Sequence, residues 1–180
     1  MLQGCSKRSV RSFLLLAAFA VAAVMLIQSE SAADQSFKAK NGLSFNYPDG
    51  WTALENHRGP ITNISIFNRL QPTITIAITV SEGSIPPGSA LPDEEATKAA
   101  LASSGQDVKL LSFKKITVAG HDAALAEYST ETGGMYIQTR SVSIIDGTNL
   151  FAVTSIFMDK SKVADGQKIS EIIEKSLSLK

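Results

Sequence analysis

Cysteine and histidine are scarce in this sequence. One cysteine, Cys5, and two histidines, His57 and His121, occur among 180 residues. A zinc site takes three or four closely spaced ligands, and two isolated histidines beside turn residues do not provide them. A disulfide needs a second cysteine. We therefore expect no metal site and no disulfide framework.

Catalytic motifs are absent as well. There is no Gly-x-Ser-x-Gly elbow, and the loop-like stretch 81–92 lacks the lysine of a phosphate-binding loop. Three groupings of polar residues are candidates for a catalytic site: the carboxylates Glu127 and Glu131, four apart on one strand face, the acidic cluster 93–95, and the serines and glycine at 103–105. Each grouping has a simpler structural explanation. Carboxylates on an exposed strand face are ordinary polar surface, acidic residues at a helix start complement the helix dipole, and serine and glycine are common where a helix ends. We therefore expect no enzyme, no catalytic residue and no cofactor.

The N-terminal segment has the three parts of a secretory signal peptide. Basic residues within 7–11 precede an unbroken apolar run at 13–27, and small residues follow at 31–33. The run of 15 residues is short for a membrane span, which needs about 20. We predict cleavage after residue 33, which removes Cys5 and leaves one domain, residues 34–180. An uncleaved N-terminal membrane anchor is the alternative.

The predicted mature chain limits both the compartment and the class of partner. Its 147 residues contain 14 basic and 16 acidic side chains, a formal net charge of −2. No basic patch is available to hold phosphates, so nucleic-acid binding is not expected. No later apolar run is long enough for a membrane span. A secreted chain without cysteine fits the bacterial periplasm, where disulfides are optional.

Alternating apolar and polar residues predict eight strands. Asn41-Gly42 separates the first two and favours a hairpin turn with positive φ at both positions. In the strand 73–80, isoleucine and valine occupy one face, and threonine and alanine the other. The predicted strands are 36–40, 43–47, 61–68, 73–80, 108–120, 121–131, 135–145 and 150–158.

Two helices complete the prediction. Residues 93–105 begin with acidic side chains and carry an alanine face, which suggests close packing on a sheet. In 163–180, an apolar stripe recurs with helical spacing, at Ile169, Ile172, Ile173 and Leu177. The order ββββ-α-ββββ-α, with short turns between neighbouring strands, indicates the α+β class with an antiparallel sheet.

These elements resemble the superfamily that contains the photosystem II extrinsic protein PsbP and the bacterial envelope protein DcrB. The resemblance lies in the opening strand GLSFNYPDGW (42–51), the hairpin ITVAGHDAALAEYSTETGG (116–134), the hairpin RSVSIIDGTNLFAVTSIF (140–157) and the last helix EIIEKSLSLK (171–180). It implies an α/β/α sandwich, with helices on both faces of the sheet, and a non-enzymatic role, usually in binding other proteins. Nothing marks the thylakoid compartment, so the bacterial envelope branch is favoured. Neither histidine matches the metal-binding histidines proposed for some PsbP proteins.

The opening stretch 41–51 is interpreted as core rather than as a ligand site. Leu43, Phe45 and Tyr47 share one face of a strand, and Trp51 is expected at the edge of the same core. Binding surfaces are expected on loops instead. The candidates are the loop 83–92, with its rigid apolar stretch 85–87, the turn 56–61 and the turn 131–135, and plain connections between elements are the alternative.

The function that fits these observations is that of a secreted, periplasmic, non-catalytic accessory protein. Its expected partner is another envelope or secreted protein. A small-molecule or lipid carrier is the alternative, in which the alanine-faced helix and the sheet part to hold a ligand. A hydrolase with an unrecognised site is a third reading.

Overall fold

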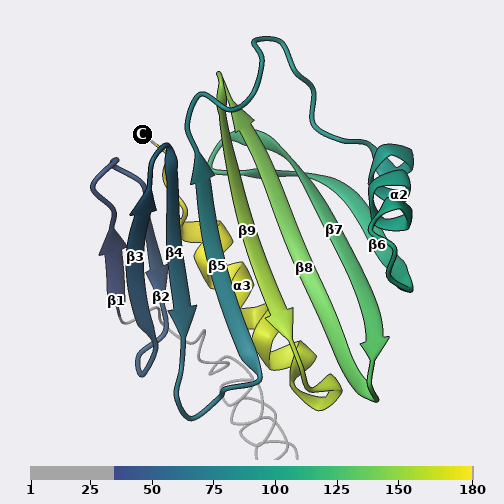
Figure 1. Cartoon of the computed structure of the whole chain (residues 1–180). Coiled ribbons are helices and arrows are strands. Elements are labelled where there is room, and N and C mark those ends of the chain that lie inside the picture. The colour runs from purple at the N-terminus through teal and green to yellow at the C-terminus, as the bar shows by residue number, and fades with distance from the viewer. Residues whose placement is uncertain (1–34, 180) are drawn as a thin grey trace, which may run out of the picture. The chain divides into compact units, whose positions relative to one another are not determined.

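The computed structural model describes residues 35–179, which form two antiparallel sheets and two α-helices (Figure 1). The large sheet has seven strands in the order β3-β4-β5-β9-β8-β7-β6, and β1 pairs with β2 separately. The elements are β1 (Gln35–Lys38), β2 (Ser44–Tyr47), β3 (Thr52–Arg58), β4 (Ile61–Phe67), β5 (Ile74–Ser81), α2 (Glu94–Ser103), β6 (Val108–Val118), β7 (His121–Thr132), β8 (Met135–Asp146), β9 (Asn149–Phe157), the 3-10 helix η1 (Lys160–Lys162) and α3 (Val163–Ser176).

The predicted first hairpin is confirmed, although its turn differs from the prediction. Phe37 pairs with Phe45 across β1 and β2, and their rings stack with centroids 5.3 Å apart. Only Gly42 has positive φ, at 93°. The backbone N–H groups of Ala39 and Gly42 donate to Leu43 O and Ala39 O. The turn is therefore longer than a two-residue turn with positive φ at both positions.

One strand was missed by the sequence prediction. β3 forms the edge of the large sheet and pairs with β4 along its whole length. Its sequence, TALENHR, has little apolar alternation, and none of its residues is buried. An edge strand with so little buried surface gives a weak periodic signal. The observed order is therefore βββββ-α-ββββ-α, with five strands before the first helix.

The core lies between one face of the large sheet, the β1–β2 hairpin and α3. Ile169 and Ile173 of α3 are buried against strands whose inward residues are isoleucine, valine and phenylalanine. The backbone of Ser44 exchanges hydrogen bonds with that of Ser178, which joins β2 to the segment after α3. The predicted core residues Leu43, Phe45 and Trp51 are buried, with exposed fractions of 1%, 1% and 5%, while Tyr47 is half-buried.

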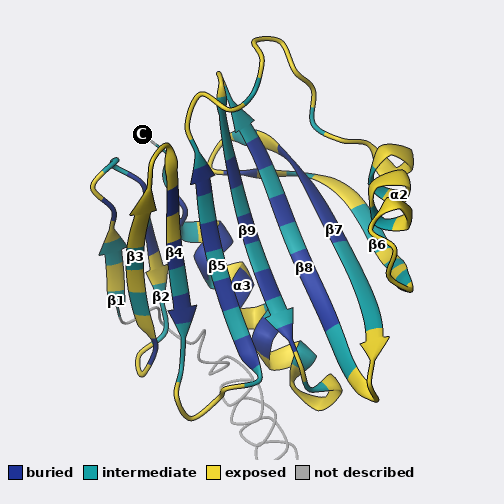
Figure 2. Ribbon diagram, in the orientation of Figure 1, coloured by how far each residue is buried: buried dark blue, intermediate teal, exposed yellow. Residues whose placement is uncertain are grey.

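Helix α2 lies against β6 at the sheet edge, and none of its residues is buried (Figure 2). It begins as predicted, because the Asp93 carboxylate accepts a hydrogen bond of 2.8 Å from Ala96 N. Its alanine face was expected to pack closely, but Ala96 and Ala100 are exposed. Alanine methyl groups bury little apolar area, so they hold the helix only loosely. Helix α3 and the β1–β2 hairpin thus lie over one face of the sheet, and α2 reaches only the edge at β6, so the predicted coverage of both faces by helices is not confirmed.

The predicted signal peptide, residues 1–33, lies outside the described residues. Within 35–179, no helix is both long enough and apolar enough to cross a membrane.

Candidate functional site

The face of the large sheet opposite α3 has no helix over its centre, because α2 lies only at the β6 edge (Figure 1). The strand registers place two neighbouring cross-strand rows of side chains on this open face. From β3 to β6, one row is Leu54, Ser65, Ala77, Thr154, Ser141, Ala126 and Phe113, and the other is Asn56, Asn63, Thr79, Ala152, Ser143, Ala124 and Lys115.

The chemistry of the open face is uniform at its centre. From β4 to β7, both rows consist of alanine, serine, threonine and asparagine, without a charged or large side chain. Two exposed apolar side chains border it on β3 and β4: Leu54 is 56% exposed and Ile61 is 42% exposed. A floor of small uncharged side chains allows another surface to approach closely without desolvating charge.

A groove crosses the open face near β6, β7 and β8. Its wider part, of about 540 Å³, lies between loop residues 89–92 and the floor formed by Lys115, Asp122, Ala124 and neighbours. Its narrower part, of about 200 Å³, lies between α2 and the sheet. The two parts share Pro92 and Ala124 in their linings, so they are adjacent. The groove is open to solvent, and loop residues and α2 form one of its walls.

The predicted binding loop is anchored at its start and lines the groove at its end. Gly83 N donates to Asn149 Oδ1 at 3.0 Å, and Ile85 N donates to Thr148 O at 3.0 Å. The loop is thereby held to the turn between β8 and β9. Pro86 and Pro87 are exposed beyond this anchor. Of the loop, residues 89–92 contact the groove, whereas the apolar stretch 85–87 does not.

The two histidines lie in different parts of the sheet. His57 Nδ1 is 3.0 Å from Thr62 Oγ1, and its Nε2 is 2.9 Å from Glu55 Oε1. His121 lines the wider part of the groove, with Nδ1 3.9 Å from Asp146 Oδ1. Among residues 35–179, no cluster of three or more metal-ligating side chains is present.

The remaining predicted positions have structural roles. Residues 59–60 form the turn between β3 and β4, and residues 133–134 form the turn between β7 and β8. Ser103 Oγ and Ser104 Oγ donate to backbone carbonyls in the last turn of α2. The acidic pair after Asp93 binds Lys98 at 3.0 and 2.9 Å, and these contacts raise the pKa of Lys98.

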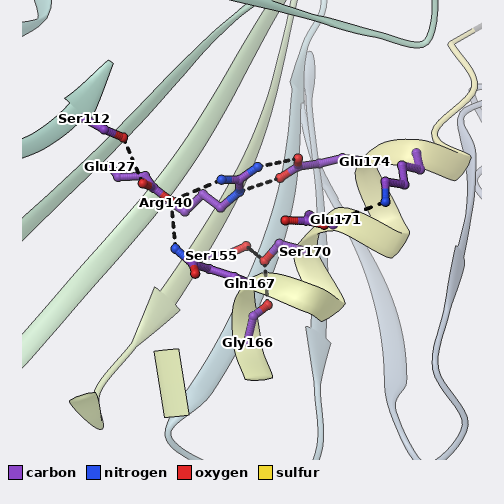
Figure 3. Close-up of polar contacts among 10 residues, drawn as sticks. Ser112, Glu127, Arg140, Ser155, Gly166, Gln167, Ser170, Glu171 and Glu174 are labelled. Carbon is purple, nitrogen blue, oxygen red and sulfur yellow. Dashed lines mark hydrogen bonds and ion pairs between the residues drawn. The ribbon is translucent and has the colours of Figure 1, made fainter. Parts of the chain in front are cut away.

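A buried ionic network was not predicted from the sequence (Figure 3). Arg140 of β8 donates from Nε and Nη2 to both oxygens of Glu174 on α3, at 3.0 and 2.8 Å. Its Nη1 donates to Glu127 Oε1 of β7 at 3.1 Å. Gln167 Nε2 and Ser112 Oγ also donate to Glu127, at 2.9 and 2.8 Å. The network therefore joins three strands to α3.

The electrostatics of this network indicate a structural role. Hydrogen bonds to the Glu174 carboxylate raise the pKa of Arg140, against the opposing effect of burial. Both carboxylates are occupied by donors, and the three side chains are 7–16% exposed. Glu127 is therefore not the solvent-exposed polar cover that its strand position suggested, and it lies four residues from an exposed Glu131 without forming a carboxylate pair with it.

Comparison with known proteins identifies the fold. No family model and no curated protein sequence matches the chain. Among solved structures it is similar to cyanobacterial PsbP (CyanoP) from Synechocystis sp. PCC 6803, with a TM-score of 0.61 and 13% identity over 81% of this chain and 92% of that one. It is also similar to LpqN, described as involved in cell envelope biogenesis of Mycobacterium tuberculosis, with a TM-score of 0.51 and 15% identity over 80% and 90% of the two chains.

A third similar structure, from Bacteroides thetaiotaomicron VPI-5482, has a TM-score of 0.53 and 16% identity. The match covers 82% of this chain but 49% of that one, so this chain spans about half of its length. Identities this low establish a shared architecture rather than a shared role. At that level the resemblance indicated by the sequence is confirmed: the chain has the PsbP-like fold.

Proposed function

We propose that this chain is a secreted, periplasmic, non-catalytic accessory protein that binds another envelope or secreted protein through the open face of its sheet. The observation that carries the proposal is the open face itself. A surface of seven strands is left largely uncovered, its central rows are uncharged, and Leu54 and Ile61 border it with exposed apolar area. Small uncharged side chains let a partner approach closely, and the exposed apolar side chains at the border provide surface that a partner would bury.

Two further observations support the proposal. Two of the candidate catalytic carboxylates are occupied: Glu127 by Arg140, Gln167 and Ser112, and Asp93 by the first turn of α2. LpqN, which shares the fold, is involved in cell envelope biogenesis of Mycobacterium tuberculosis. The N-terminal sequence pattern supports export, and we extend it to a periplasmic location by analogy with that structure.

Partner binding is tested by affinity capture from envelope extract with matched variants. Thr79→Arg places a long charged side chain at the centre of the open face, where Thr79 is half-buried. Thr132→Arg makes the same change at the exposed end of β7 and is the control. We expect a protein retained by the wild type and by Thr132→Arg, with at least about tenfold less retained by Thr79→Arg. Equal retention by all three chains would refute the assignment of the open face.

Export is tested independently with a fusion to alkaline phosphatase, which requires disulfides and is active outside the cytoplasm. The full chain should give an active fusion, and deletion of residues 1–33 should abolish its activity. Activity that persists after the deletion would contradict the predicted signal peptide.

A small-molecule carrier is the second candidate, and the groove is the observation that favours it. Its wider part has a volume in the range of ligand sites, about 300–1,000 Å³. Mass spectrometry of the gently purified protein under native conditions would show a ligand carried from the cell.

A further inference from the structure

The groove has a different chemistry at its two ends. The wider part contains Lys115, His121 and Asp122, together with loop residues 89–92. The narrower part is lined mainly by apolar groups of α2, β6 and β7, including Leu101, Phe113 and Ala126. A ligand that fills both must therefore be polar at one end and apolar at the other.

The charges at the wider end are of opposite sign and are not neutralised by each other. Lys115 pairs with Ala124 across β6 and β7, and Thr117 pairs with Asp122, so the registers place Lys115 and Asp122 diagonally on the same face. Neither takes part in an ion pair within residues 35–179. A cation and an anion held side by side complement a ligand that carries both charges close together.

The narrow end has the size of a side chain rather than of a folded element. Its volume is about 200 Å³, whereas a helix with side chains is about 10–12 Å across. The exposed methyl groups of Ala96 and Ala100 and the half-buried Leu101 form the α2 side of this space. An apolar side chain inserted there would bury surface that α2 leaves exposed to water, which favours binding.

We propose that the groove binds an amino acid or short peptide that has both termini charged and carries a large apolar side chain. The carboxylate lies against Lys115, the ammonium lies against Asp122, and the side chain enters the narrow part beneath α2. The groove overlaps the open face at Ala124, Ala126, Ser141 and Ser143, which belong to the two cross-strand rows. Thr79 does not line the groove, so the Thr79→Arg variant tests protein binding without altering this ligand site.

Binding is measured by calorimetry and by NMR chemical-shift changes, with the dipeptide Leu-Leu as the probe and the purified chain as the receptor. Replacing Leu-Leu with Ala-Ala should weaken binding about ten- to a hundredfold, the equivalent of leaving one leucine side chain unburied. Blocking either terminus should weaken binding several-fold, as N-acetyl-Leu-Leu or as Leu-Leu amide.

Two charge variants identify which residue holds which terminus. In Asp122→Asn, the penalty for acetylating the ammonium should disappear, while the penalty for amidating the carboxylate should remain. In Lys115→Gln, the pattern should be reversed. Penalties that persist unchanged in both variants would overturn the proposed orientation.

Two alanine variants of α2 test the narrow part. Ala100 lines it, whereas the neighbouring Ala99 is exposed and does not. Ala100→Leu should fill the space and weaken Leu-Leu binding at least about tenfold, and Ala99→Leu should leave it unchanged. Equal affinities for the two variants, or no binding of Leu-Leu at millimolar concentration, would refute the site. Tighter binding of dodecanoate than of Leu-Leu would assign the groove to an acyl chain and would also overturn the proposal.

Discussion

Replacing Arg140 with methionine should lower the free energy of unfolding by about 3–5 kcal/mol, because removal of one partner leaves buried charges uncompensated. Arg140 makes three hydrogen bonds of 2.8–3.1 Å to Glu174 and Glu127. At about 1.5–3 kcal/mol for each bond to a charged group, their sum would reach about 5–9 kcal/mol. That sum is an upper limit, because the guanidinium is desolvated in the folded protein and the variant avoids this cost.

The measurement is urea unfolding followed by circular dichroism and by the fluorescence of the buried Trp51. Lys168→Met, on the exposed surface of α3, is the matched control and should change the stability by no more than about 0.5 kcal/mol. The double variant Arg140→Met with Glu174→Met should recover at least half of the loss, since it removes the uncompensated carboxylate on α3 as well. A loss below about 1 kcal/mol for Arg140→Met, or a double variant no more stable than the single one, would refute the reasoning.

Three further changes test separate parts of the fold. Gly166→Ala should lower the melting temperature, because a Cβ at Gly166 would collide with the ring of the buried Phe157; overpacking costs about 1–3 kcal/mol, more than the gain of about 1 kcal/mol in helix propensity, and a higher melting temperature would contradict this contact. Ala119→Gly should stabilise the protein by about 1 kcal/mol in thermal unfolding, because Ala119 has φ of 54° in a region that costs non-glycine residues about 1–2 kcal/mol. Hydrogen bonds from Ser161 lower the pKa of Asp159, so this carboxylate stabilises the fold above its unfolded pKa of about 4, and the contribution is lost as the pH falls through the lower folded value. Asp159→Asn should therefore be less stable than the wild type at neutral pH and approach it in strong acid, and a difference in urea midpoint that is independent of pH would show that the contact does not act in this way.

The elements with strong periodic patterns could be predicted from the sequence. Strand β5 alternates without exception between buried and half-buried residues, and α3 presents Ile169 and Ile173 to the core. Strand β3 could not be found in this way, because its single neighbour β4 supplies the pairing while its own residues bury little. The apolar pattern of a segment reflects how many of its side chains are buried, and an edge strand buries few.

The candidate sites were likewise predictable only in part from the sequence. Loop residues 83–92 were identified from their composition, but only the fold brings positions 89–92 to β6, β7 and His121. The sequence does contain a signal for the ionic network. Arg140 lies on the same strand face as the buried Val142 and Ile144, and Glu174 follows the buried Ile173 in α3. A charge at an inward position predicts a partner, but it does not say where along the chain that partner lies.

The position of β9 in the large sheet has a consequence for the nascent chain. Strands β3, β4 and β5 are neighbours in sequence and can pair as soon as they are synthesised, but β5 finds its other neighbour in β9, with Ile78 opposite Val153. Throughout synthesis of the residues between them, a strand with four inward isoleucine and valine side chains presents an unpaired edge, a recognised cause of aggregation. Pairing across so long a separation also slows folding. Because of this strand order, the chain must avoid aggregation through the exposed edge of β5 until β9 has been made.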